Sequence, residues 1–206
     1  MDRIKGKDWK RACDTLQAMV GRTEDVFVPI TRNTADGEQT GYVSVKKEAA
    51  RLIATMPKPG RDMYETMFGD KATTMIKRAR TNNDRVEMAQ AMSLYLYTEA
   101  GAEAANWLGT YHLDRAEFQA ASRYFQQLIN RGGIRELKPR TLLKSAYAFH
   151  HAGDRVARDD VFKELDRRGI EIQLREQSRS VAELQESINR LATNVSMQSA
   201  SDSPIY

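Results

Sequence analysis

The side chains that most often carry out covalent or metal chemistry are few in this sequence and lie far apart. The only cysteine, Cys13, lies on a predicted helix beside Asp14 with no histidine nearby, which favours a structural thiol over a nucleophile. His150 and His151 are adjacent, so on a helix their rings diverge, whereas metal-binding pairs usually lie four residues apart. His112 is expected to pack between helices in place of an aromatic residue. These residues predict neither a catalytic nucleophile nor a metal site.

Motifs for phosphate binding and for hydrolysis are absent from the sequence. Gly132-Gly133 lacks the following Lys-Ser or Lys-Thr of a phosphate loop, and no Gly-x-Ser-x-Gly elbow occurs. Glu99, Glu103 and Asp114 are expected to be solvated carboxylates. We therefore predict that the chain is not an enzyme and that it takes no cofactor and no metal.

The composition is that of an ordinary globular protein with a slight excess of basic residues. Among 206 residues, 41% are hydrophobic and 29% are charged, and no apolar run approaches the ~20 residues of a membrane-spanning helix. The net charge is +4 and the isoelectric point is about 9.2. Because both signs are interspersed, the charge indicates solvated helix faces and makes nucleic acid an unfavoured partner. The first ten residues lack the apolar core of a signal peptide.

Apolar periodicity of the helical kind runs through most of the chain. It predicts helices over residues 8–20, 45–56, 61–68, 71–80, 85–95, 100–113, 117–130, 139–151, 155–168 and 180–194. Between the first two helices, Val26, Val28 and Ile30 alternate before Asp36-Gly37, which predicts a β-hairpin or an ordered loop over residues 24–45. The turn is expected to be longer than the tight two-residue type. Residues 196–206 are Ser-rich and aperiodic, so they are predicted to form a flexible tail or linker.

Glycine and proline mark the predicted helix breaks. Pro57-Lys58-Pro59-Gly60 is expected to end the second helix, because proline lacks an amide donor and disfavours the helical conformation just before it. Gly69 is expected to separate the next two helices. Ser44 is a suitable N-cap for the helix that follows it.

The helices also contain a repeat. One unit, over residues 102–131, has Leu108-Gly109 in its first helix and Ala121, Phe125 and Leu128 in its second. A second unit, over residues 139–168, starts 37 residues after the first and places its corresponding residues at Ala146, Phe149, Phe162 and Leu165. This spacing resembles the tetratricopeptide pattern, which has a period of ~34 residues. The resemblance implies an all-α fold, an array of antiparallel αα-hairpins with the small β-hairpin or loop inserted near the N-terminus.

Packing gives a reason for this pattern. Gly109 and Ala121 are small enough to let the two helices of a hairpin approach closely, and Phe125 fills the space beside them. A weaker unit runs from Gly69 to Tyr95. Departures from the pattern are Ala105 at the usual tryptophan position, Ala116 in a turn and Arg158 at a small position. A non-repeating helical bundle is the alternative.

Several phrases resemble a narrower bacterial group, in which a helical-repeat segment precedes a quinoprotein-like β-propeller. They are Glu24-Asp25-Val26-Phe27-Val28-Pro29, Pro59-Gly60-Arg61, Tyr97-Thr98-Glu99-Ala100-Gly101 and Leu108-Gly109-Thr110-Tyr111-His112-Leu113-Asp114-Arg115. This resemblance implies a periplasmic or envelope-associated protein of which the chain is the helical part. A cytoplasmic location is the alternative, because the sequence contains no signal peptide.

Stacked hairpins form a concave groove that is lined by the first helix of each unit. Three- and four-residue steps place the candidate partner-binding residues on one face of two helices. They are Glu103, Asn106, Thr110 and Asp114 in the first unit, and Arg140, Leu143, Tyr147, His150 and His151 in the second. The surface is acidic at one side and basic at the other, and it predicts a protein or peptide partner. The alternative is that these residues simply face water.

The last predicted helix, 180–194, has an apolar stripe of Val181, Leu184, Ile188 and Leu191. It is expected to cap the final hairpin, within a helical-repeat domain that spans residues 1–195, and a dimer contact is the alternative. The leading functional interpretation is a non-catalytic protein–protein interaction scaffold within a larger envelope protein. The alternatives are a basic nucleic-acid-binding repeat and a structural spacer for a neighbouring β-propeller.

Overall fold

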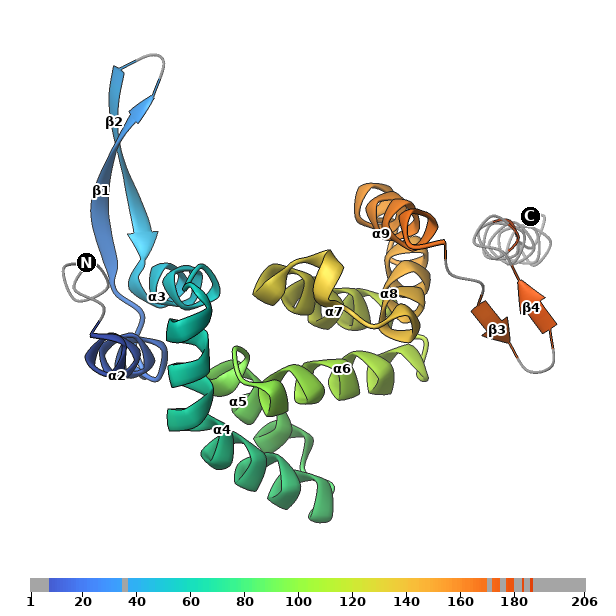
Figure 1. The fold of residues 1–206 in the computed structure, drawn as a ribbon, viewed down its shortest axis with the longest axis horizontal. Helices are drawn as coiled ribbons and strands as arrows, with labels where there is room; N and C mark the ends of the chain where they lie inside the picture. Colours follow the sequence, from blue (N-terminus) through green and yellow to red (C-terminus); the bar gives the residue numbers. More distant parts are fainter. Residues whose placement is uncertain are drawn as a thin grey trace, which may run out of the picture. The chain divides into compact units, whose positions relative to one another are not determined.

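A computed structural model describes residues 8–34, 37–169, 172–174 and 177–179, together with Glu183 and Glu186 (Figure 1). The chain divides into two compact units, Met1–Ala105 and Asn106–Tyr206. The described part is mostly α-helical with a small antiparallel sheet near the N-terminus, so the prediction of a helical fold with an inserted hairpin is confirmed.

The first unit contains five helices or parts of helices among its described residues. They are α2 (Trp9–Val20), α3 (Val45–Ala54), α4 (Lys58–Thr81), α5 (Arg85–Tyr95) and the first half of α6 (Glu99–Leu113). Asp8 and Ser44 cap α2 and α3 by accepting hydrogen bonds from Arg11 N and Lys47 N. The core of this unit joins residues of α2, α3, α4 and the connector between α3 and α4, namely Cys13, Leu16, Ala49, Ile53, Met56, Tyr64 and Phe68.

The prediction of two helices separated at Gly69 is wrong, because α4 runs without a break from Lys58 to Thr81. Gly69 is buried in the middle of this helix, and a Cβ at this position would lie 2.5 Å from Oε1 of Glu65. The Glu65 side chain therefore folds over the glycine, and its Oε2 accepts a hydrogen bond of 2.9 Å from Glu99 N at the start of α6. Gly69 provides room for this helix-capping carboxylate and does not end the helix. Likewise Pro59 lies in the first turn of α4, where its missing amide proton costs nothing.

The predicted hairpin consists of β1 (Phe27–Thr34) and β2 (Gly37–Ser44), which pair antiparallel. The pairing extends to Thr34 opposite Gly37, so the connection is shorter than the sequence suggested. In Figure 1 the two strands stand away from the helices that flank them in the sequence, α2 and α3. The hairpin is thus held at its base and exposed along most of its length.

The second unit contains the rest of α6, α7 (Phe118–Gly132), the short 3-10 helix η1 (Ile134–Glu136), α8 (Pro139–His151) and α9 (Arg155–Arg167). The predicted start and end of α8 are confirmed, and α6, α7 and α9 begin and end within two residues of the prediction. A Cβ on Gly109 would lie 2.9 Å from Cζ of Phe125, so α6 and α7 approach as closely as predicted. The core of the unit is formed by Leu108, Ala121, Phe125, Leu128, Leu142, Ala146, Phe149, Val161, Phe162 and Leu165.

Two short strands follow α9, β3 (Ile172–Leu174) and β4 (Gln177–Arg179), which pair antiparallel and were not predicted. The predicted capping helix 180–194, apart from Glu183 and Glu186, and the tail 196–206 lie outside the described residues.

Candidate functional site

In the second unit, two of the predicted groove residues of α6, Asn106 and Thr110, contact two residues of α8 that were not predicted, Thr141 and Lys144. Lys144 Nζ of α8 donates a hydrogen bond of 2.9 Å to Oγ1 of Thr110, and Oγ1 of Thr141 lies 3.5 Å from Oδ1 of Asn106. Asn106 and Thr110 are both half-buried. These contacts place the two helices side by side, and they mean that Asn106 and Thr110 help to position α8.

Four side chains form one stripe along α8, at steps of four, three and four residues: Arg140, Lys144, Tyr147 and His151. We call these four residues the α8 stripe. Arg140 is exposed and the other three are half-buried. Of the predicted residues on α8, Arg140, Tyr147 and His151 belong to this stripe. Leu143 and His150 lie seven residues apart on its flank.

The two basic residues of the α8 stripe differ from several arginines elsewhere in the described part of the chain. Arg51, Arg78 and Arg167 each pair with a nearby glutamate. Within the described part of the chain, neither Arg140 nor Lys144 has a carboxylate partner; Lys144 reaches only the hydroxyl of Thr110. The α8 stripe therefore places two cations without a carboxylate partner at the edge of an aromatic cluster.

That aromatic cluster joins the end of α8 to the start of α7. The ring of His151 lies 4.4 Å from the rings of both Phe118 and Tyr147, measured between centroids. Beside it, Nε2 of Gln119 donates a hydrogen bond of 2.8 Å to the carbonyl of Ala152, just after the end of α8. The cluster fixes Tyr147 and His151 in place, so they present a rigid surface next to the two cations.

Burial lowers the pKa of both adjacent histidines. His151 is surrounded by rings, and its Nε2 atom is buried without a hydrogen-bond partner among the described residues. For His150, burial is the largest cause and the neighbouring charges of His151 and Arg158 add to it. NH1 of Arg158 lies 3.2 Å from Nδ1 of His150, so this histidine turns toward α9 and away from the α8 stripe.

Two predicted residues of the first repeat do not join this group. Glu103 lies in the first unit, where its carboxylate is 3.8 Å from NH2 of Arg80. Asp114 is exposed in the turn after α6, as the expectation of a solvated carboxylate required. The acidic side of the predicted groove is therefore not assembled as a site within the second unit.

A second feature of α6 was missed by the sequence reasoning. Trp107, Tyr111 and Arg115 follow one another at four-residue steps; the two rings stack at 5.6 Å, and the Arg115 guanidinium lies 3.6 Å from the Tyr111 ring centroid. The four-residue spacing of two aromatic residues and an arginine in the sequence could have predicted this stack. His112 packs on Tyr124 with ring centroids 5.3 Å apart, which confirms that it takes an aromatic packing position.

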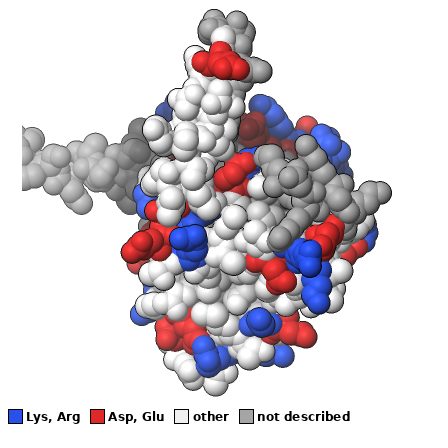
Figure 2. Space-filling view, turned by 90° about the vertical axis from the view of Figure 1, so that its left-hand side faces the viewer, with Lys and Arg blue, Asp and Glu red and all other residues white. Residues whose placement is uncertain are grey.

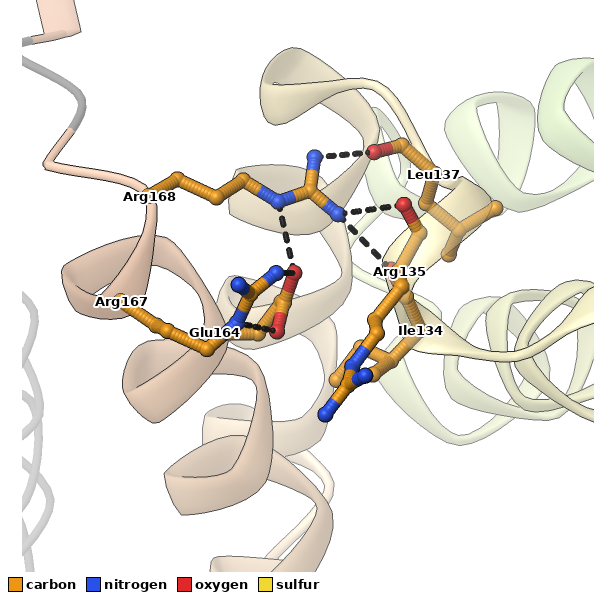
Figure 3. A network of polar contacts seen from close by, with 6 residues as sticks. All are labelled: Ile134, Arg135, Leu137, Glu164, Arg167 and Arg168. Atoms are coloured by element: carbon orange, nitrogen blue, oxygen red, sulfur yellow. Dashed lines mark hydrogen bonds and ion pairs between the residues drawn. The ribbon is translucent and has the colours of Figure 1, made fainter.

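A cavity in the second unit lies between other elements. It measures about 620 Å³ and is lined by α7, η1 and α9, including Ile129, Ile134, Val156 and Lys163. None of the predicted groove residues lines it. One wall is the network in Figure 3, in which Glu164 binds Arg167 and Arg168 while Arg168 donates to the carbonyls of Ile134, Arg135 and Leu137. Because Glu164, Arg167 and Arg168 satisfy one another's charges, this network is a structural brace.

Reactive groups are not gathered anywhere in the described part of the chain. Cys13 is buried, its thiol lies 3.7 Å from the carbonyl of Gly60, and burial with the nearby charge of Asp14 raises its pKa to about 11. It is therefore a protonated core residue. Among the described residues, no three His, Cys, Asp or Glu side chains lie close enough to hold a metal ion.

Comparison with known proteins adds no further guide to the site. The chain matches no protein-family model, no curated protein and no solved structure. Within the described residues, none of the helices has both the length and the apolar character that crossing a membrane requires.

Proposed function

We propose that this chain is a non-catalytic protein-interaction module built from tetratricopeptide-like helical hairpins. Contacts between successive hairpins support the repeat. The hydrogen bonds from Thr141 to Asn106 and from Lys144 to Thr110 join residues 35 and 34 positions apart. A similar interval of 33 residues separates Gln119 from Ala152. Such intervals match the ~34-residue period of this repeat type.

The partner that fits best is a peptide segment with acidic side chains, and it binds at the α8 stripe. The observation that carries this proposal is the pair of cations, Arg140 and Lys144, with no carboxylate partner in the described part of the chain. Tyr147 and His151 supply a fixed apolar surface beside them. A short peptide can thus gain ionic contacts and aromatic contact area from one face, and the two rings are already held in place.

Selection from a display library of random peptides tests this proposal. We expect the parent chain to enrich peptides containing Asp or Glu next to an apolar residue. The selected peptides should bind an Arg140→Glu, Lys144→Gln variant about tenfold or more weakly, which corresponds to at least ~1.4 kcal/mol. Affinity for the parent should fall as salt is raised, because exposed charge pairs are screened.

Arg123→Glu is the matched control, since Arg123 is an exposed arginine on α7 and lies outside the α8 stripe. It repeats the arginine-to-glutamate change on the same unit and lowers the net charge by two, against three in the stripe variant. If Arg123→Glu weakens binding as much as the stripe variant does, the interaction is a general charge effect. If the parent enriches no acidic peptides, the α8 stripe is not a peptide site.

A further inference from the structure

The hairpin of β1 and β2 has features that neither the helical repeat nor the α8 stripe explains. It is a sheet of only two strands, and such a sheet is at best marginally stable in water without further strands or a covering helix. Phe27 and Tyr42 are nevertheless 63% and 75% exposed. Figure 2 shows the hairpin as an almost entirely uncharged column. Among its described side chains at residues 26–31 and 37–43, only Glu38 is charged.

The hydrogen-bond pattern determines which backbone groups remain free. Val45 N donates a bond of 2.8 Å to the carbonyl of Val26. Because directly opposed residues alternate between bonded and non-bonded pairs, Pro29–Tyr42 and Thr31–Thr40 are non-bonded pairs whose amides and carbonyls point outward. The contact of 3.0 Å between the hydroxyls of Thr31 and Thr40 fits such a closely spaced pair.

The two outer edges are therefore unequal. On β1 the outward positions include Pro29, which has no amide proton and blocks the addition of another strand there. On β2 the outward positions Glu38, Thr40 and Tyr42 carry a complete set of donors and acceptors. This edge has no lysine and no proline, which are the devices that normally protect an exposed edge strand.

We propose that the β2 edge pairs with the β2 edge of a second copy of this chain, antiparallel about a two-fold axis at Thr40. In this register Thr40 faces Thr40 of the second copy, and Glu38 faces Tyr42 of the second copy. Each facing pair exchanges two backbone hydrogen bonds. The two Glu38 carboxylates lie at opposite ends of the new interface, so no like charges oppose each other.

The properties of the two edges determine how many chains the assembly contains. Pairing through β2 forms a four-stranded sheet whose outer strands are both β1, and Pro29 blocks further growth at each side. The assembly is therefore a closed dimer and not a fibre. The β2 edge carries one aromatic side chain, Tyr42, and offers less than the roughly 800 Å² per partner of a standard interface. The dimer is therefore weak and forms only as concentration rises.

Sedimentation velocity over a concentration series tests the proposal with two matched proline variants. Thr40→Pro removes an outward amide from the β2 edge, and Thr31→Pro removes one from the β1 edge. Both lose the same hydroxyl contact between Thr31 and Thr40. We expect the parent and Thr31→Pro to approach the mass of two chains, and Thr40→Pro to show a dissociation constant at least about tenfold higher. Circular dichroism checks that each variant is folded.

Amide hydrogen exchange of the unmodified chain provides a test that needs no variant. Exchange at Glu38, Thr40 and Tyr42 should slow as concentration rises, whereas exchange at the outward β1 amides of Phe27 and Thr31 should not. A parent that stays monomeric over the whole series overturns the proposal, even if the edge captures an extended segment of another protein. Growth beyond two chains, or an equal effect of the two prolines, overturns it as well.

Discussion

Arg168 Nε donates a hydrogen bond of 2.7 Å to Oε1 of Glu164, one turn earlier on α9 (Figure 3). The other nitrogens of the same guanidinium donate to the carbonyls of Ile134, Arg135 and Leu137 in the connector between α7 and α8. Glu164 is also held by two hydrogen bonds from Arg167. The carboxylate thus orients the arginine that joins α9 to this connector.

Neutralising Glu164 should remove part of the acid sensitivity of the second unit. The two arginines hold the pKa of Glu164 at about 2, below its usual value of 4.5. Because the folded-state pKa is lowered, the stabilisation is complete above about pH 4.5 and is lost as pH falls toward 2. We expect the free energy of unfolding, measured in urea between pH 2 and 7, to decline less steeply with acid in Glu164→Gln than in the parent. Asp166→Asn is the control, because it removes a nearby exposed carboxylate. If the unfolding free energy of Glu164→Gln declined with acid as steeply as that of the parent, the lowered pKa of Glu164 would not be a source of the acid sensitivity.

Adding a methyl group at Gly109 should destabilise the contact between α6 and α7. The new Cβ would lie 2.9–3.2 Å from three atoms of the fully buried Phe125 ring. This overpacking exceeds the gain in helix propensity, so Gly109→Ala should lower the free energy of unfolding by about 1–2 kcal/mol. Phe125→Leu in the same chain should absorb part of the penalty, and a double-mutant cycle measures this coupling. Additive effects of the two substitutions would show that the ring is not the cause.

Gly101→Ala should be much more damaging, because the obstacle is backbone. A Cβ at Gly101 would lie only 1.8 Å from the carbonyl oxygen of Tyr95. The surrounding turn cannot yield, since buried Thr98 accepts a hydrogen bond from Gly101 N and donates one to that same carbonyl. We expect a loss of roughly 3 kcal/mol or more in denaturant unfolding.

Gly132→Ala is the matched control for this prediction. Its Cβ would meet the end of the Glu136 side chain at 2.1 Å, and that side chain can rotate away. The substitution should therefore be close to neutral. If the two alanine variants cost the same, the close approach at Gly101 is not the cause of its effect.

Replacing His151 with phenylalanine should reduce the loss of stability in mild acid. Burial lowers the folded-state pKa of His151, so the unfolded chain takes up a proton first as pH falls below about 6.5. Stability is therefore complete above that pH and declines below it. His151→Phe retains the stacking on Phe118, and its unfolding free energy should change less between pH 7.5 and 5.5 than that of the parent. His112→Phe is the comparison variant, because it replaces a histidine outside this aromatic cluster in the same way. Equal pH dependence of the unfolding free energy in the parent and in His151→Phe would show that His151 does not cause the loss of stability.

Local patterns in the sequence determined most of the helices and the packing inside each hairpin. Gly109, Ala121 and Phe125 were identified from their spacing, because a small residue beside a large one has the same steric meaning in any helical hairpin. The alternation from Val26 to Ile30 likewise predicted the strands. Gly69 misled the prediction, because glycine both ends helices and makes room within them.

The arrangement of the candidate site depended on the tertiary structure. Sequence periodicity placed Arg140, Tyr147 and His151 on one face of a helix. Only the folded chain showed that Thr110 holds Lys144 beside them and that His150 turns toward Arg158. It also placed the outward amides of β2 on a free edge. These are contacts between residues distant in sequence or in strand register, and they follow from how elements pack, which no local propensity encodes.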